Sequence, residues 1–333
     1  MRIAIDAMGG DHAPKEIVLG ALSGLEFLGP DDECVLIGRE EEVRACLPSE
    51  GLDRRIRIEH APSVIEMDET PIEALRQKKD SSIAAMARMA AEGQADAVIS
   101  AGNTGACVAA CQLKMRTLPG VSRPGIAVAL PAFHGPVTIC DVGANVAPKP
   151  RHLQEYAHMA SIYAEQILGI RRPRVGLLSI GAEDVKGNPL VKQARELLRQ
   201  DAQLNFVGNV EGRELLQGAI DVAICDGFVG NIVLKLVEGL ADGLFRTIEK
   251  ELEHEAPQLI EAFKPVVRRV WMKHDYSEYG GAPLLGVDGV CIICHGSSGR
   301  QAIKNAVRVA RESLRGELNA VFESRLSGEI AHA

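Results

Sequence analysis

The stretch VCIICHGSSGR, from Val290 to Arg300, contains the pattern that decides the fold. An apolar run typical of a buried strand passes through a small, polar turn into what reads as the start of a helix. Strand-like and helix-like runs alternate in this way along almost the whole chain, from RIAIDA at Arg2 to a C-terminal helix. Such alternation predicts an α/β fold with a mostly parallel sheet and helices on both of its faces.

Two cysteines and a histidine in this stretch allow other interpretations. Cys291, Cys294 and His295 form the C-x-x-C-H of a c-type haem attachment site, and the cysteines alone could be half of a zinc site or a redox pair. Successive residues of a strand point to opposite faces, so a strand here would separate the two cysteines. The other cysteines also lie mostly in apolar surroundings. We therefore interpret them as core residues, and predict neither a metal site nor a cofactor.

Length and composition set broad limits. The chain has 333 residues, of which 46% are hydrophobic, enough for a single α/β catalytic domain over 1–333 that could consist of two intertwined subdomains. The formal net charge of -8 argues against nucleic-acid binding, which needs a clustered basic surface. The first residues do not resemble a signal peptide, and no apolar run reaches the roughly 18 residues of a membrane span. We therefore expect a cytoplasmic protein.

One segment, 234–273, interrupts the alternation with two consecutive helical patterns and no strand between them. Both patterns are amphipathic, and Pro257 separates them, which predicts a protruding antiparallel helical hairpin. The second arm concentrates basic and apolar residues, and its candidate docking residues are Lys264, Arg268, Arg269, Trp271 and Lys273. This pattern suits docking to an acidic protein or to an anionic membrane surface. A solvated face over an ordinary helix-packing or dimer interface is the alternative.

Five glycine-rich polar loops follow predicted strands: SAGNTGA at Ser100, CDVGANV at Cys140, SIGAEDVKGN at Ser179, CDGFVGN at Cys225 and HGSSG at His295. We expect these loops at one edge of the sheet, because the carboxyl ends of parallel strands meet there. Glycine lets backbone N–H groups approach an anion, so the loops together predict a polar, phosphate-sized pocket. The sequence contains neither the G-x-G-x-x-G nor the G-x-x-x-x-G-K-[ST] nucleotide motif.

At these loops the chain resembles the bacterial phosphate acyltransferase family. The resemblance covers nearly the whole chain and rests on motifs in that family's order: MRIAIDAMGGDHAP, ISAGNTGA, DVGANV, GLLSIGAEDVKGN, DGFVGN, EYGGAPLLG and HGSS. It implies a fold like those of phosphotransacetylases and isocitrate or isopropylmalate dehydrogenases. It also implies transfer of a fatty acyl group from acyl-[acyl-carrier-protein] to inorganic phosphate for phospholipid synthesis, a homodimer, and peripheral association with the inner face of the cell membrane. The acidic carrier protein would then be a partner for the basic arm.

In such a reaction phosphate is itself the nucleophile, so the enzyme has to hold it against the thioester carbonyl and stabilise the developing charge. His295 is the candidate general acid for the departing thiolate, and a structural cap of the neighbouring loop is its alternative role. Asn103 and Thr104 would face the carbonyl oxygen or the pantetheine arm, and Lys186 would neutralise charge. We expect Asp226, like the other strand-terminal carboxylates Asp141 and Asp6, to orient a loop by accepting backbone N–H bonds.

Substrate binding is predicted mainly at two places. A helix start at Gly296, Ser297 and Ser298, together with Asn231 of the DGFVGN loop, would hold the phosphate. The remaining candidates for substrate contact are glycines and asparagines of the same loops: Gly105, Asn145, Asn188 and Gly230.

Three alternative functions share some of these features. A phosphotransacetylase would use acyl-CoA with the same phosphate loops. A dehydrogenase of the same fold would act on a phosphorylated or hydroxy-acid substrate, although the nucleotide fingerprint is missing. A non-enzymatic docking scaffold would bind lipid or a partner without consuming a thioester.

Overall fold

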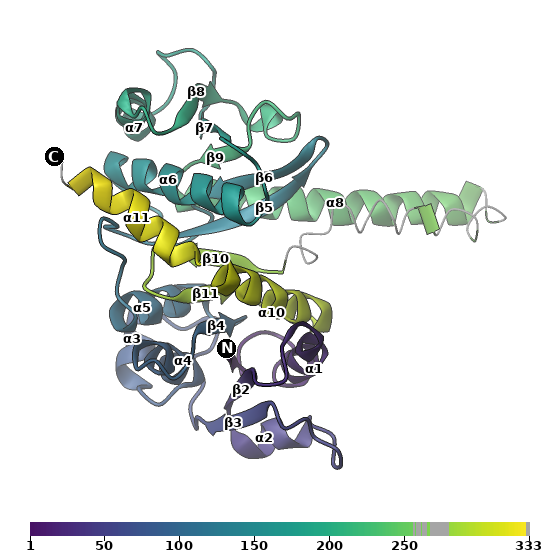
Figure 1. Cartoon of the computed structure of the whole chain (residues 1–333). Coiled ribbons are helices and arrows are strands. Elements are labelled where there is room, and N and C mark those ends of the chain that lie inside the picture. The colour runs from purple at the N-terminus through teal and green to yellow at the C-terminus, as the bar shows by residue number, and fades with distance from the viewer. Residues whose placement is uncertain (256, 258–260, 262–264, 267–279, 331–333) are drawn as a thin grey trace.

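The computed structural model describes residues 1–255, 257, 261, 265–266 and 280–330, and in them one sheet of eleven strands runs through the molecule (Figure 1). The strand order is β3-β2-β1-β4-β11-β10-β5-β6-β9-β7-β8. The strands are β1 (Arg2–Asp6), β2 (Glu33–Gly38), β3 (Ile56–His60), β4 (Ala97–Ser100), β5 (Gly125–Ala132), β6 (Gly135–Cys140), β7 (Arg174–Leu178), β8 (Asn205–Val210), β9 (Val222–Ile224), β10 (Ala282–Leu285) and β11 (Val290–Ile293).

The sheet is mostly parallel, as predicted, but its direction reverses in the middle. Strands β3, β2, β1, β4 and β11 are parallel neighbours, and so are β6, β9, β7 and β8. Between these two parallel groups, the three pairings β11–β10, β10–β5 and β5–β6 are antiparallel. An odd number of reversals means that the two groups run in opposite directions. The expectation that all five loops lie at one edge of the sheet is therefore wrong.

Helices cover both faces, which confirms the predicted fold class. In the first parallel group, alternate strand residues pack on opposite clusters: Ile3 and Ile5 face α1 and α10, whereas Ala4 faces α4 and α5. In the second group, α6, α7 and α11 share one cluster with β7 and β9. The helices are α1 (Lys15–Gly24), α2 (Glu40–Ala45), α3 (Pro71–Gln77), α4 (Ser82–Ala91), α5 (Thr104–Lys114), α6 (Pro150–Gln166), α7 (Pro189–Gln200), α8 (Gly227–Glu255), α10 (Arg300–Arg315) and α11 (Leu318–Ile330), with 3-10 turns at Leu25–Phe27 and Gly212–Glu214.

The alternation in β11 places its cysteines as the sequence predicts. Cys291 belongs to the cluster formed with α4 and α5, whereas Cys294 belongs to the cluster formed with α1 and α10. Both side chains are buried. Their separation onto opposite faces of the sheet is confirmed.

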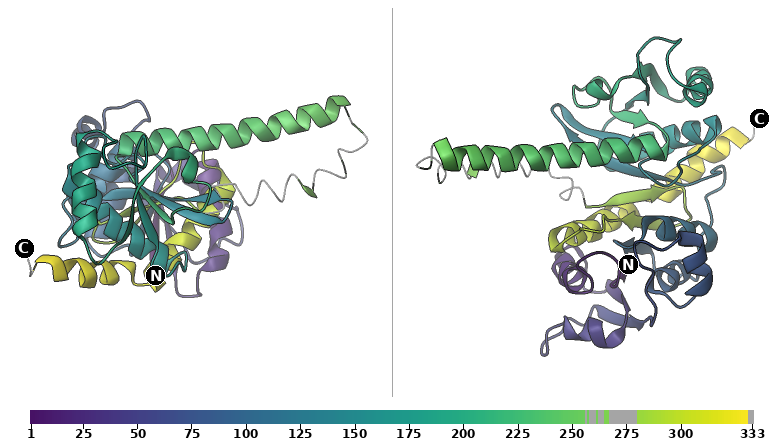
Figure 2. Two further views of the ribbon diagram at one scale, coloured as in Figure 1. Left: turned by 90° about the horizontal axis from the view of Figure 1, so that it is seen from above. Right: turned by 180° about the vertical axis from the view of Figure 1, so that it is seen from behind.

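Helix α8 projects from the body of the molecule as one long rod (Figure 2). The sequence places the first helical arm from residue 234, but the helix already begins at Gly227, because Asp226 Oδ1 accepts hydrogen bonds from the N–H groups of Phe228 and Val229 at 3.0 and 2.9 Å. The predicted second arm and its docking residues, Lys264, Arg268, Arg269, Trp271 and Lys273, lie outside the described residues. In the described part of the chain, no helix combines the length and the apolar character needed to cross a bilayer.

Candidate active site

A cavity of about 310 Å³ lies where the two parallel groups meet. Its apolar wall comes from the central strands, from the loop after β6 and from α8, and includes Ile126, Val128, Val142, Leu234 and Ile293. Its polar wall consists of Asp11, Thr104, Asn231, Lys235, Glu238, His295 and Ser298. A cavity with one apolar and one polar wall fits a substrate that carries both a hydrocarbon and an anionic part.

Two chain segments that approach from opposite directions build the polar wall. Thr104 opens α5 after β4, and His295, Gly296 and Ser298 follow β11, so these residues belong to the first parallel group. Asn231, Lys235 and Glu238 come from α8, which starts beyond β9 in the second group. Because the groups run in opposite directions, the site spans the antiparallel seam formed by β10 and β5, with α8 as the element that crosses it.

The start of α8 is held by a buried carboxylate at the end of β6. Asp141 accepts hydrogen bonds from the backbone N–H groups of Ile126, Gly143, Ala144 and Asn145 at 2.7 to 3.1 Å. Burial raises the pKa of Asp141, while these four N–H groups act in the opposite direction. Gly227 N–H donates to the Asn145 carbonyl at 2.8 Å. Asp141 thus orients the loop after β6, whose Asn145 carbonyl holds the first residue of α8, and Asp226 caps the helix; both carboxylates accept backbone N–H bonds, as the sequence predicts.

The shortest polar contact across the cavity joins Lys235 of α8 to His295 after β11. Lys235 Nζ lies 3.1 Å from His295 Nε2, and His295 Nδ1 lies 2.8 Å from Ser297 Oγ. Partial burial and the positive charge of Lys235 lower the pKa of His295 from its usual 6.5, while Asp11 acts in the opposite direction. The ring is therefore mainly neutral at pH 7 and carries one proton: this lies on Nε2 where Nδ1 accepts from Ser297 N–H at 3.2 Å, or on Nδ1 where Nε2 accepts from the Lys235 ammonium.

Sequence reasoning missed Lys235, Glu238 and Asp11 as part of the site. A signal for two of them was available, because Lys235 and Glu238 follow Asn231 by four and seven residues and share its helix face. The two glycines of DGFVGN predict a loop, and a loop has no helix face on which this spacing would count. Burial raises the pKa of Glu238, and Lys235 partly offsets this effect.

Five predicted site residues do line the cavity: Thr104, Asn231, His295, Gly296 and Ser298. The predicted helix start at 296–298 is wrong in detail, since α10 begins at Arg300 with Gly299 as its N-cap. Ser298 N–H donates to the His295 carbonyl at 2.9 Å, so this backbone donor closes a turn. Ser298 is buried and faces the cavity. The neighbouring Ser297 is exposed and is not a lining residue.

Asn103 does not line the cavity, because its side chain is used to build the start of α5. Its Oδ1 accepts from Ala106 N–H at 3.0 Å, which is an N-cap hydrogen bond. Its Nδ2 donates to the carbonyls of Glu66 and Glu69 at 3.1 and 3.0 Å. The structure thus places Asn103 behind Thr104, where it fixes the position of that residue.

The other predicted residues also lie off the lining. Asn145 is buried and donates through Nδ2 to the Pro124 carbonyl at 2.7 Å, and Asn188 caps α7 by accepting from Val191 N–H at 2.9 Å. Lys186 is exposed in the loop after β7. Gly105 and Gly230 sit against Pro71 and against Asp141, where a side chain has no space. Catalytic or binding roles for these residues, and for Asp226, stay predictions.

Comparisons with known proteins identify the family of the chain. The family model described as "Fatty acid synthesis protein" matches residues 1–320. A phosphate acyltransferase from Desulfitobacterium hafniense is 52% identical over 315 residues, which cover 94% of this chain and 93% of that protein. Another from Heliobacterium modesticaldum is 49% identical and covers 99% of both chains. The chain belongs to the phosphate acyltransferase family. The resemblance seen in the loop motifs is thereby confirmed.

Solved structures place this member of the phosphate acyltransferase family in a wider fold group. A phosphotransacetylase from Streptococcus pyogenes is similar with a TM-score of 0.62 at 19% identity, covering 95% of this chain and 94% of that one. A 4-hydroxythreonine-4-phosphate dehydrogenase from Klebsiella pneumoniae has a TM-score of 0.52 at 12% identity, with coverage of 94% and 97%. At such identities the likeness concerns the fold alone, and it agrees with the fold class predicted from the sequence.

Proposed function

We propose that this protein transfers an acyl group from a thioester to inorganic phosphate, with acyl phosphate as the product. The observation that carries the proposal is the cavity with one apolar and one polar wall, found in a member of the phosphate acyltransferase family. Ile126, Val128 and Ile293 offer a surface for a hydrocarbon chain. Lys235, Asn231 and Ser298 offer donors for an anion.

The chemistry needs no nucleophile from the protein. A phosphate oxygen attacks the carbonyl carbon, negative charge develops on the carbonyl oxygen, and the C–S bond breaks to release the thiolate. Two features of the polar wall support this route: Lys235 brings a positive charge to the site of developing negative charge, and the neutral His295 beside it can take up the proton that the attacking hydrogen phosphate loses and deliver it to the thiolate. A thiol with a pKa of about 8.5 leaves readily, so charge stabilisation is the larger contribution.

We further propose acyl-[acyl-carrier-protein] as the thioester and phospholipid (phosphatidic acid) synthesis as the use of the product. The decisive experiment is to incubate the purified protein with phosphate and either acyl-carrier-protein or acyl-CoA thioesters of one chain length, and to trap acyl phosphate as the hydroxamate. We expect product from the carrier-protein thioester, and none without phosphate. Acyl-CoA as the better donor would instead support a phosphotransacetylase. Thioester loss that does not depend on phosphate would refute both functions.

Ser298 and Asn231 are proposed to hold the phosphate. Replacing Ser298 by alanine removes a buried hydroxyl from the polar wall, so we expect the KM for phosphate to rise about tenfold, the equivalent of one hydrogen bond of about 1.4 kcal/mol. The KM for the thioester should change little. Steady-state kinetics with phosphate varied at saturating thioester measures the effect. The control is Ser49→Ala, which removes an exposed serine hydroxyl away from the cavity. If the two variants show the same phosphate KM, Ser298 does not bind phosphate.

A homodimer is proposed from an apolar stripe on α8. The stripe consists of residues spaced by four, each 36 to 68% exposed: Phe228, Ile232, Leu236, Leu240, Leu244 and Ile248. Rows with this spacing on two helices interdigitate at a crossing angle of about -50°. The outer end of α8 exposes four glutamates against one lysine over residues 249–255, which disfavours contact with anionic lipid and with an acidic carrier protein. A second copy of the chain is therefore the occupant we favour.

Replacing Leu240 by glutamate should break this dimer, because it places a charge in the middle of the apolar stripe. We expect the mass measured by sedimentation to fall from that of two chains to that of one. Leu113→Glu is the control, since Leu113 is 70% exposed on α5 and lies off the stripe. A single-chain mass for the unaltered protein would rule out the proposed interface, and so would a dimer that survives Leu240→Glu.

The basic segment that ends the predicted hairpin is proposed as the contact for the carrier protein or for an anionic membrane surface. The proposal rests on composition, since Lys264, Arg268, Arg269 and Lys273 alternate with Trp271 and aliphatic residues. It assigns the protein to the cytoplasm, in peripheral contact with the inner face of the cell membrane.

A further inference from the structure

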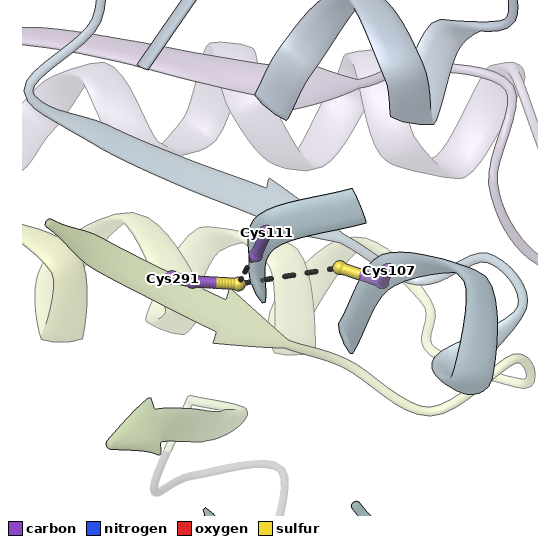
Figure 3. Close-up of side chains that lie close together, drawn as sticks. All are labelled: Cys107, Cys111 and Cys291. Carbon is purple, nitrogen blue, oxygen red and sulfur yellow. Dashed lines mark hydrogen bonds between the residues drawn. The ribbon is translucent and has the colours of Figure 1, made fainter. Parts of the chain in front are cut away.

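Three thiols from two elements meet in the core beside the proposed active site (Figure 3). Cys107 and Cys111 are one turn apart on α5 and point the same way, because four residues separate them. Cys291 faces them from β11. The Sγ atom of Cys291 lies 3.6 Å from that of Cys111 and 4.0 Å from that of Cys107, and all three sulfur atoms lie within 4.8 Å of one another.

These separations match those of thiolates that share a metal ion. With metal–sulfur bonds of about 2.3 Å, two thiolates on one ion are about 3.8 Å apart in a tetrahedral site and about 4.0 Å apart in a planar trigonal one. The two distances from Cys291, 3.6 and 4.0 Å, bracket these values, and the third pair of sulfur atoms lies within 4.8 Å. Ordinary core packing would be satisfied by any small apolar side chain and does not require three sulfur atoms around one point.

The number and type of donors select the metal. Within the described residues, the only group of cysteine, histidine and carboxylate side chains placed around one point contains these three sulfur atoms. Structural zinc sites have four protein ligands, whereas soft thiolate sets with fewer donors suit Cu(I). We propose that Cys107, Cys111 and Cys291 form a three-coordinate site for Cu(I). Each cysteine releases its thiol proton on binding, so the affinity rises with pH.

The three cysteines lie directly behind the cavity wall. Thr104 precedes Cys107 by one turn of α5 and lines the cavity, and Ile293 lies two residues after Cys291 on the same side of β11 and also lines it. An ion that joins the three sulfur atoms fixes α5 against β11 directly behind both residues. The copper site is independent of which reaction the cavity performs.

The test is an anaerobic titration of the full-length, reduced protein with Cu(I), delivered from the chromophoric chelator bathocuproine disulfonate. We expect one equivalent per chain, and an X-ray absorption spectrum that shows three sulfur neighbours. Cys107→Ala, Cys111→Ala and Cys291→Ala should each weaken binding by more than the roughly 10- to 100-fold that follows loss of an outer-shell partner. Thermal unfolding of the metal-free variants checks that each one folds.

Two control variants separate this site from adventitious thiol binding. Cys46→Ala removes the one cysteine that is not buried, and Cys34→Ala removes a buried cysteine outside the cluster. Both variants should still bind one equivalent of Cu(I) per chain, with the affinity of the unaltered protein. One equivalent that survives loss of all three cluster cysteines, or that disappears in Cys46→Ala, would overturn the proposal. An absorption spectrum with two sulfur neighbours, or tighter binding of Zn²⁺ with a fourth ligand, would overturn the three-coordinate assignment.

Discussion

Replacing Gly230 by alanine should destabilise the protein by about 3 kcal/mol or more and abolish its activity. Gly230 lies in the first turns of α8, and an added Cβ there would overlap the carbonyl oxygen of Asp141. The same atom would lie 2.9 Å from the Asp141 carbonyl carbon and 3.0 Å from Cys225 Sγ. All three neighbours belong to the buried ends of β6 and β9, so the clash can be relieved only by moving α8. That movement carries Asn231 and Lys235 away from His295.

A second glycine of the same helix provides the control. Gly239 has no atom within 4 Å of an added Cβ, so Gly239→Ala should raise the free energy of unfolding by about 0.5 to 1 kcal/mol through helix propensity alone. Denaturant unfolding followed by circular dichroism gives both values. If Gly230→Ala and Gly239→Ala change the free energy of unfolding by the same amount, α8 does not approach Asp141 this closely in solution.

Replacing Lys235 by methionine should lower kcat/KM for acyl transfer about 100-fold or more, which is the usual effect of removing one donor that stabilises developing negative charge. Methionine keeps the length of the side chain and removes its charge. Fold and stability should persist, because Lys235 is exposed and interacts with other residues of the cavity wall, His295 and Glu238, rather than with the core. The expected loss is mainly in kcat, since the charge acts most strongly on the oxyanion.

Lys114→Met is the matched control for this substitution. Lys114 is an exposed lysine at the end of α5 and does not line the cavity, so its loss should leave both kinetic constants within about twofold. Lys186→Met is a useful third variant, because the sequence favours Lys186 as the charge-neutralising residue. If Lys186→Met loses activity while Lys235→Met retains it, the cavity geometry has pointed to the wrong lysine.

The strands of the two parallel groups could be predicted from sequence because burial on both faces leaves a continuous apolar run between turns. Strand β10 was missed for a physical reason. Its four residues include Pro283, which lacks an N–H group, and glycines flank it on both sides. Its two antiparallel pairings cancel, so that β11 and β5 run in the same direction. The net reversal comes from the antiparallel pairing of β5 with β6, and this pairing is why the loops do not all share one edge.

The candidate site could be predicted only in part, because residue type does not distinguish a ligand from a cap. Asn103, Asn188 and Asp226 occupy helix N-caps, where the same side chains are favoured whether or not a substrate is near. Asn231 and Ser298 are polar residues of the same kind in similar glycine-rich segments, but their side chains line the cavity. Which of these residues meet was decided by long-range pairing of strands, and local sequence does not encode it.

The placement of β11 and α10 among the first strands affects how the protein emerges from the ribosome. Strand β4 lies between β1 and β11, and α1 packs against α10, although β11 and α10 are synthesised after most of the chain. During translation β4 therefore has an unpaired edge, and the apolar side of α1 has no cover. The N-terminal strands cannot complete their core until nearly the last helix has been released, so both halves of the molecule finish folding together, late and through contacts distant in sequence.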